Sequence, residues 1–216
     1  MRGIPSPAQN TMPGPTVDFW NERFRTGTTG WDRGAVHPWL RQQLGDRTLK
    51  PCRILVPGCG AGHEVLALAA AGFDVTALDY ADEAVQRVRA RLAAAGLRAE
   101  VVQADVRQWQ PAQPFDAVWE QTCLCALYPD DWPRYGAQLH RWLAPGGRLH
   151  ALFMQVPRPG AAQGWVEGPP YHCDINAMRA VFPATLWRWP KPPYAQIVHG
   201  DGPQFELGLV LERTPG

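Results

Sequence analysis

The chain has 216 residues, of which 45% are hydrophobic, so it is long enough and apolar enough to bury a large core. Its 21 basic and 20 acidic residues are interspersed and leave a formal net charge of +1, which gives no electrostatic case for a nucleic-acid or membrane partner. No apolar run approaches the length of a transmembrane helix.

The five cysteines show no C-x-x-C pair and no disulfide-framework spacing, which favours reduced thiols and a cytoplasmic location. We expect a monomer that acts on a small-molecule substrate. Residues 1–15 are rich in Pro, Gly, Ser, Thr and Asn and lack the apolar stretch of a signal peptide, so we expect a flexible leader there. Residues 16–216 contain no linker-like stretch and are expected to form one domain.

The first predicted element is a short helix that begins near Asp18. It carries Trp20 and Phe24 four residues apart, on one face, and Trp31 follows in the turn after it. Taken singly, such aromatics are read most simply as packing for the helix.

A β-α-β unit follows. Residues 53–56 form an apolar run typical of a buried strand, a glycine-rich turn comes next, a helix extends to Gly72, and a second strand ends at Asp79. Glycines in such a turn let the backbone approach a ligand, and an acid at the end of the second strand is placed to hold ribose hydroxyls.

The glycine spacing indicates which cofactor this unit binds. Gly58, Gly60 and Gly62 give G-x-G-x-G, and His63 stands where the dinucleotide pattern G-x-G-x-x-G requires its third glycine. S-adenosyl-L-methionine has a ribose but no phosphate, and this spacing before an acid-tipped strand is the usual form of class I methyltransferases. A nicotinamide-dependent oxidoreductase, or a glycine-rich turn without a ligand, is less consistent with the spacing.

The alternation of strands and helices continues to the end of the chain. Helices are predicted at residues 83–95, 132–143 and 174–181, strands at residues 99–103, 115–120, 147–153, 184–189 and 205–212, and a Pro/Gly-rich loop at residues 156–170. This order predicts an α/β, Rossmann-like class I methyltransferase fold: a seven-stranded, mostly parallel sheet with an antiparallel last strand and helices on both faces.

Four segments occur together in an order that narrows the family. They are Asp18–Gly34, Val56–Gly60, Glu120–Pro129 and Gly168–Tyr171. Together they resemble the thiopurine S-methyltransferase family, nearest to its branch of plant and bacterial thiol and halide methyltransferases. The resemblance covers nearly the whole chain after the leader.

The resemblance implies S-adenosyl-L-methionine as cofactor and S-adenosyl-L-homocysteine as its product. It places aromatic residues over the cofactor, backbone atoms of the glycine turn on its methionine part, Asp79 on the ribose, and Asp105 with the Val106 backbone on the adenine edge. Gln121 is placed at the methionyl end. The implied cofactor-binding residues are Trp20, Phe24, Trp31, Gly58, Gly60, Asp79, Asp105, Val106 and Gln121. The family usually has Trp where this chain has Phe24.

On the acceptor side, the resemblance implies that Tyr171 faces the methyl acceptor. Glu120 is either a carboxylate near the substrate or a polar strand end, and the sequence favours neither. Thiopurine-type members carry an Arg where this chain aligns Trp132, which favours a small soft acceptor such as a thiol, halide or chalcogen species over a thiopurine. An O- or N-methyltransferase of another small metabolite, or a non-catalytic cofactor-binding protein, remains the alternative.

Other reactive residue types suggest no further chemistry. Cys123 and Cys125 have no visible His partner and methyl transfer needs no enzyme thiol, so both are interpreted as small buried residues. The six histidines lack metal-ligand spacing, and we expect no metal.

Overall fold

The computed structural model describes residues 14–198 and 202–215, so the expected leader at residues 1–15 lies almost wholly outside the described residues. Its last residue, Pro15, does contact the body of the protein, because its carbonyl accepts a hydrogen bond from Tyr80 Oη at 3.1 Å. Within the described part of the chain, no helix combines the length and apolarity needed to cross a membrane.

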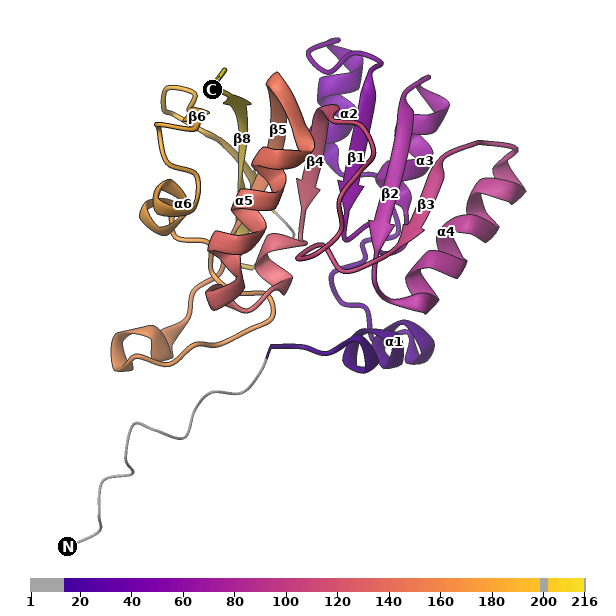
Figure 1. The fold of residues 1–216 in the computed structure, drawn as a ribbon. Helices are drawn as coiled ribbons and strands as arrows, with labels where there is room; N and C mark the ends of the chain where they lie inside the picture. The colour runs from indigo at the N-terminus through magenta and orange to yellow at the C-terminus, as the bar shows by residue number, and fades with distance from the viewer. Residues whose placement is uncertain (1–13, 199–201, 216) are drawn as a thin grey trace, which may run out of the picture.

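Eight strands form one mixed sheet in the order β3-β2-β1-β4-β5-β8-β6, with β7 also paired to β8 (Figure 1). The strands are β1 (Arg53–Pro57), β2 (Asp74–Asp79), β3 (Glu100–Gln103), β4 (Phe115–Gln121), β5 (Leu143–Gln155), β6 (Trp187–Arg188), β7 (Ala195–Val198) and β8 (Phe205–Arg213). Strands β1 to β5 pair in parallel, whereas β8 is antiparallel to β5, β6 and β7. The predicted fold class is confirmed, and the short strand β7 adds one strand to the predicted seven.

Five of the six described α-helices cover the two faces of this sheet, and the first helix lies across its carboxyl edge. The helices are α1 (Val17–Thr26), α2 (Pro38–Gly45), α3 (His63–Ala70), α4 (Asp82–Ala95), α5 (Trp132–Trp142) and α6 (Ile175–Val181). The described residues also include the short 3-10 helices η2 (Leu124–Ala126), η3 (Pro129–Asp131) and η4 (Pro159–Gln163). Helix α2 and the 3-10 turns were not predicted from the sequence. Strand β5 begins earlier than predicted, because the Ala-Pro-Gly-Gly stretch after Leu143 is part of an irregular strand end beside β4.

The core is divided by the sheet into two parts because successive strand residues point to opposite faces. Leu55 and Val118 pack on one face, in the cluster that includes α5 and α6. Ile54 and Ala117 pack on the other, in the cluster that includes α2, α3 and α4. The central strands are thus buried on both faces, as parallel strands usually are.

Helix α1 is held across the carboxyl edge of the sheet, next to the start of α4 (Figure 1). Thr16 caps it by accepting a hydrogen bond from the Phe19 amide, and Gly27 ends it with φ +70°. Asn21 Oδ1 accepts the Glu83 amide of α4 at 3.2 Å. This placement puts the aromatic residues of α1 over the edge where the parallel strands end.

Candidate active site

A cavity of about 730 Å³ lies at the carboxyl edge of the sheet, which is within the usual size range of small-molecule sites. Residues from the ends of β1, β2, β4 and β5, from the loop after β3, and from the start of β8 form its wall together with α1. All of the cofactor-binding residues expected from the sequence line this cavity: Trp20, Phe24, Trp31, Gly58, Gly60, Asp79, Asp105, Val106 and Gln121.

The glycine turn after β1 needs its glycines for backbone geometry and for space. Gly58 and Gly60 have φ values of +59° and +50°, which side chains with a Cβ rarely adopt. A Cβ on Gly58 would also lie 2.8 Å from Cys123 Cβ, whereas one on Gly60 would meet nothing closer than Phe24 Cζ at 3.8 Å. The turn therefore leaves its backbone open toward α1 at Gly60.

Asp79, at the end of β2, is held in place by the backbone around it. Its two carboxylate oxygens accept the amides of Gly60 and Ala81, each at 3.0 Å. Burial raises the pKa of Asp79, and these amides oppose the shift. Because a carboxylate can accept about four hydrogen bonds, two positions remain for ligand hydroxyls from the cavity side. The residue thus fits a ribose diol.

The aromatic residues of the N-terminal segment form one contiguous group, which we call the aromatic cover (Trp20, Phe24 and Trp31). The Trp20 and Trp31 rings meet edge to face at 5.2 Å, and Phe24 and Trp31 do so at 5.8 Å. Phe24 is buried and Arg87 donates to its carbonyl at 3.1 Å, while both tryptophans are half-buried. All three residues of the cover line the cavity.

The residues that follow β3 form another part of the cavity wall. Asp105 accepts hydrogen bonds from the backbone amide and the guanidinium of Arg107, which also reaches Asp131 at 3.0 Å. Burial would raise the pKa of Asp105, but its bonds to Arg107 hold it below the ordinary value. Val106 is 8% exposed and also lines the cavity. An ionised acceptor beside an apolar side chain suits the edge of an adenine ring.

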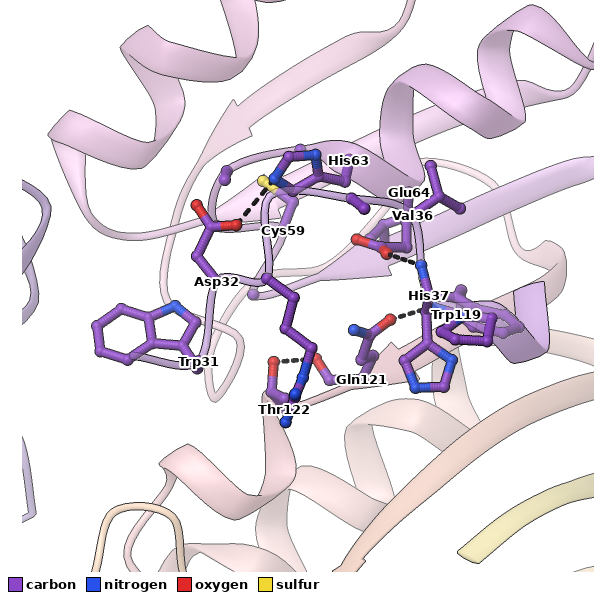
Figure 2. Close-up of a pocket in the computed structure, with 18 of the residues that line it drawn as sticks. Trp31, Asp32, Val36, His37, Cys59, His63, Glu64, Trp119, Gln121 and Thr122 are labelled. Carbon is purple, nitrogen blue, oxygen red and sulfur yellow. Dashed lines mark hydrogen bonds and ion pairs between the residues drawn. The ribbon is translucent and has the colours of Figure 1, made fainter. Parts of the chain in front are cut away.

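Gln121, at the end of β4, has a defined amide orientation. Trp119 Nε1, which can only donate, bonds to Gln121 Oε1 at 3.0 Å (Figure 2). The NH₂ of Gln121 is therefore the part left to donate to a ligand. Thr122, which follows, has φ +61°, an uncommon conformation for a residue with a side chain, and it lines the cavity as well.

The two expected catalytic residues lie one layer behind the cavity wall. Tyr171 is 6% exposed, its amide donates to the Cys125 carbonyl at 2.7 Å, and its ring meets that of the wall residue Tyr128 at 5.7 Å. Glu120 is fully buried, and one oxygen accepts the Leu124 amide at 2.6 Å. Burial, reinforced by Glu206, raises the pKa of Glu120 to about 8, so its carboxyl is largely neutral at pH 7.

A family model described as thiopurine S-methyltransferase matches residues 15–201. The chain belongs to the thiopurine S-methyltransferase family. Probable thiol methyltransferase 2 of Arabidopsis thaliana is 29% identical over 164 residues, which cover 75% of this chain and 70% of that protein. Thiopurine S-methyltransferase of Pseudomonas paraeruginosa is 28% identical over 190 residues, or 80% of this chain and 84% of that protein.

A solved structure supports the same fold. The 1,6-didemethyltoxoflavin-N1-methyltransferase of Burkholderia thailandensis superimposes with a TM-score of 0.74 at 17% identity, covering 92% of this chain and 87% of that one. That protein was crystallised with S-adenosylhomocysteine. The predicted family and activity are confirmed by the family match and the relatives: this chain is an S-adenosylmethionine-dependent methyltransferase that S-methylates small nucleophiles.

The inference drawn from Trp132 and the family resemblance about the acceptor pocket is wrong. Trp132, which replaces the Arg of thiopurine-type members, does not line the cavity. Its indole Nε1 instead donates to the carbonyls of Leu124 and Leu127, at 2.9 and 3.0 Å. Trp132 therefore braces the loop after β4, and it cannot shape the acceptor pocket by contact.

Several residues of the cavity wall were not predicted from the sequence. Tyr128, Met154, His37 and Glu206 all line the cavity. His37 Nε2 and Glu206 Oε2 lie 2.9 Å apart, and both side chains are 2% exposed. Because His37 Nδ1 accepts the Trp39 amide, the ring donates to Glu206 through Nε2. The polar Glu206 at the start of β8 was the one sequence feature that could have indicated this pair, but its partner His37 is 169 residues away along the chain.

Proposed function

We propose that this methyltransferase acts on a small thiolate, hydrosulfide or halide in preference to a thiopurine. The supporting observation is the order of side chains along the sheet edge. The expected ribose and adenine residues follow β2 and β3, whereas the wall on the β4 and β5 side contains Cys123, Cys125 and Met154. Sulfur-bearing and apolar side chains suit a soft, weakly hydrated nucleophile, and they offer few fixed partners for purine ring nitrogens.

The chemistry needs little from the protein beyond placement and exclusion of water. S-adenosylmethionine, when bound, supplies a sulfonium methyl group: the acceptor's electron pair forms the new bond to carbon as the C–S bond breaks and its pair returns to sulfur, leaving S-adenosylhomocysteine. The aromatic cover closes the site to water, which strengthens the attraction between the opposite charges. Its ring faces stabilise a sulfonium by cation–π attraction. A nucleophile ionised near neutral pH requires no general base.

The proposed cofactor contacts keep their sequence-derived roles. Asp79 holds the ribose, Asp105 and the Val106 backbone hold the adenine edge, and Gln121 donates to the methionyl end. The glycine turn, through Gly58 and Gly60, brings backbone atoms close to the methionine part. The support is that all of these residues line one cavity.

The roles of Tyr171 and Glu120 become indirect in this proposal. Tyr171 supports Tyr128, which lines the cavity beside Pro169 and Pro170. Glu120 holds the loop after β4 by accepting the Leu124 amide, and so positions Cys123 and Cys125. We classify both as positioning residues.

We further propose a monomer with one domain over residues 16–216, located in the cytoplasm, without a nucleic-acid partner. The support is the near-zero net charge and the absence of a disulfide among the described cysteines, all five of which are free. Among residues 14–198 and 202–215, no cluster of His, Cys, Asp and Glu could hold a metal ion.

An acceptor panel tests the proposed function. Release of S-adenosylhomocysteine would be followed at saturating cofactor with hydrosulfide, a small alkyl thiol, iodide, thiocyanate, a thiopurine and a phenol, each varied separately. We expect the highest kcat/KM with a small sulfur or halide acceptor. Higher kcat/KM with the phenol would favour an O-methyltransferase, and cofactor binding without turnover on any acceptor would favour a non-catalytic binding protein.

A further inference from the structure

A second cavity of about 320 Å³ adjoins the first at the glycine turn (Figure 2). The two cavities share a set of wall residues: Trp31, Arg33, His37, Gly58, Gly60, Gln121 and Thr122. Asp79, Asp105 and Val106 line only the larger cavity. The shared wall is therefore the boundary toward which the amino-acid end of a cofactor would extend when its adenosine occupies the larger cavity.

The acidic side chains of the smaller cavity already have partners. Asp32 contacts His63 Nε2 at 2.9 Å and accepts the Gly34 amide at 2.8 Å. Glu64 accepts the His37 amide at 3.0 Å, as Figure 2 shows. No hydrogen bond or ion pair joins either carboxylate to an arginine side chain of this cavity within the described part of the chain.

Two arginines line the same cavity without a recorded partner. Among residues 14–198 and 202–215, the guanidinium groups of Arg33 and Arg41 make no hydrogen bond or ion pair, although the Arg41 amide donates to the His37 carbonyl at 3.1 Å. Arg33 lines both cavities, whereas Arg41 lines the smaller cavity alone. Arg33 is thus the available cation at the junction, facing the same space as the Gln121 amide.

We propose that Arg33 binds the α-carboxylate of the methionyl group of S-adenosylmethionine, alongside the donor NH₂ of Gln121. A guanidinium matches a carboxylate in geometry and charge, and such charge-assisted bonds are the strong ones. Because Arg33 is two residues from Trp31, this contact also couples cofactor binding to the aromatic cover. The inference rests on the proposed placement of the cofactor, and its test separates the two.

The test compares two ligands that differ only at the methionyl end. S-adenosylhomocysteine carries the amino-acid group, and 5′-methylthioadenosine has the same adenosine and thioether without it. Isothermal titration in the absence of acceptor would give Kd for both ligands with wild type, Arg33→Met and Arg33→Lys. We expect Arg33→Met to weaken S-adenosylhomocysteine by roughly 10- to 100-fold, the range for a hydrogen bond to a charged group, and to leave 5′-methylthioadenosine within about twofold. Arg33→Lys should retain part of the affinity.

Arg41→Met is the matched control because Arg41 is exposed, as Arg33 is, but lines the smaller cavity alone. It should change neither Kd. Equal losses for both ligands in Arg33→Met, no loss for either, or the same loss in Arg41→Met would each overturn the role of Arg33. Failure of 5′-methylthioadenosine to bind wild type would overturn the cofactor placement and the Arg33 inference together. The measurement involves no acceptor, so it is independent of acceptor preference.

Discussion

The carboxylate of Asp32 lies 2.9 Å from His63 Nε2, and this contact joins the segment that carries Trp31 to the first residue of α3 (Figure 2). Arg91 reaches His63 Nδ1 at 3.2 Å, and since a guanidinium only donates, Nδ1 accepts and Nε2 donates to Asp32. Burial would raise the pKa of Asp32, but the Gly34 amide and His63 hold it below its ordinary value. The stability that the ionised Asp32 contributes is therefore present at neutral pH and is lost as pH falls through its lowered pKa.

The aromatic cover should be stabilised by cofactor binding. Trypsin sites at Arg23, Arg25 and Arg33 lie in or beside it, and S-adenosylhomocysteine should slow cleavage there because closure orders the segment. Asp32→Ala, which removes the contact to His63, should be cleaved faster than wild type without ligand. Limited proteolysis with mass spectrometry measures both effects. Equal cleavage of wild type with and without ligand would mean that these aromatic residues only pack α1 against the protein and do not respond to the cofactor.

Asp79→Ala should weaken S-adenosylhomocysteine binding by about 1–3 kcal/mol, because ribose hydroxyls and the Gly60 amide lose their acceptor. Asp74→Ala is the matched control, since Asp74 begins the same strand and its side chain is 78% exposed. Isothermal titration on folded variants gives both values. Unchanged affinity in Asp79→Ala would rule out the ribose assignment.

Glu120→Gln should alter how stability depends on pH. Burial raises the pKa of Glu120 to about 8 in the folded protein, whereas the ordinary pKa of a glutamate is 4.5. Between these two pH values the folded protein keeps a proton on Glu120 that the unfolded chain has released. The free energy of unfolding therefore falls as pH rises between these values, and the glutamine removes this slope. Between pH 5 and pH 8 the free energy of unfolding of the variant should rise relative to that of wild type by on the order of a few kcal/mol. Urea denaturation at each pH measures this difference. Parallel pH profiles would contradict a neutral Glu120.

Tyr171→Ala should lower turnover more than cofactor affinity, because the ring of Tyr171 supports Tyr128 on the acceptor side of the cavity. Tyr171→Phe keeps the ring and should retain most of the activity. Steady-state kinetics and S-adenosylhomocysteine titration on both variants separate kcat from Kd. A loss of affinity as large as the loss of kcat would place Tyr171 with the cofactor instead.

The part of the cavity wall around the glycine turn was predictable because its signals are local. Gly58, Gly60 and Asp79 belong to one β-α-β unit, where the ends of adjacent parallel strands must meet. The same logic predicted the fold class. Short or irregular elements such as α2 and β7 left no comparable periodicity, so they were missed.

The acceptor half was not predictable because its contacts join distant parts of the chain. His37 and Glu206 meet only when β8 returns beside β5, which places Met154 opposite Glu206. Sequence position also does not fix side-chain direction. Trp132 begins α5 at the expected place, yet its indole turns back to the carbonyls of the preceding loop. The preference for a small acceptor therefore rests on the wall residues, and no longer on Trp132.

The most direct test of the central claim is the partition of labelled methyl groups in one competition reaction. S-adenosylmethionine carrying a labelled methyl group would be supplied to the enzyme with equal concentrations of hydrosulfide, iodide, a thiopurine and a phenol, and the methylated products would be quantified at low conversion. We expect most of the label in methanethiol or iodomethane. Label found mainly in the methylated thiopurine or in the phenyl ether would contradict the proposed small, soft acceptor site.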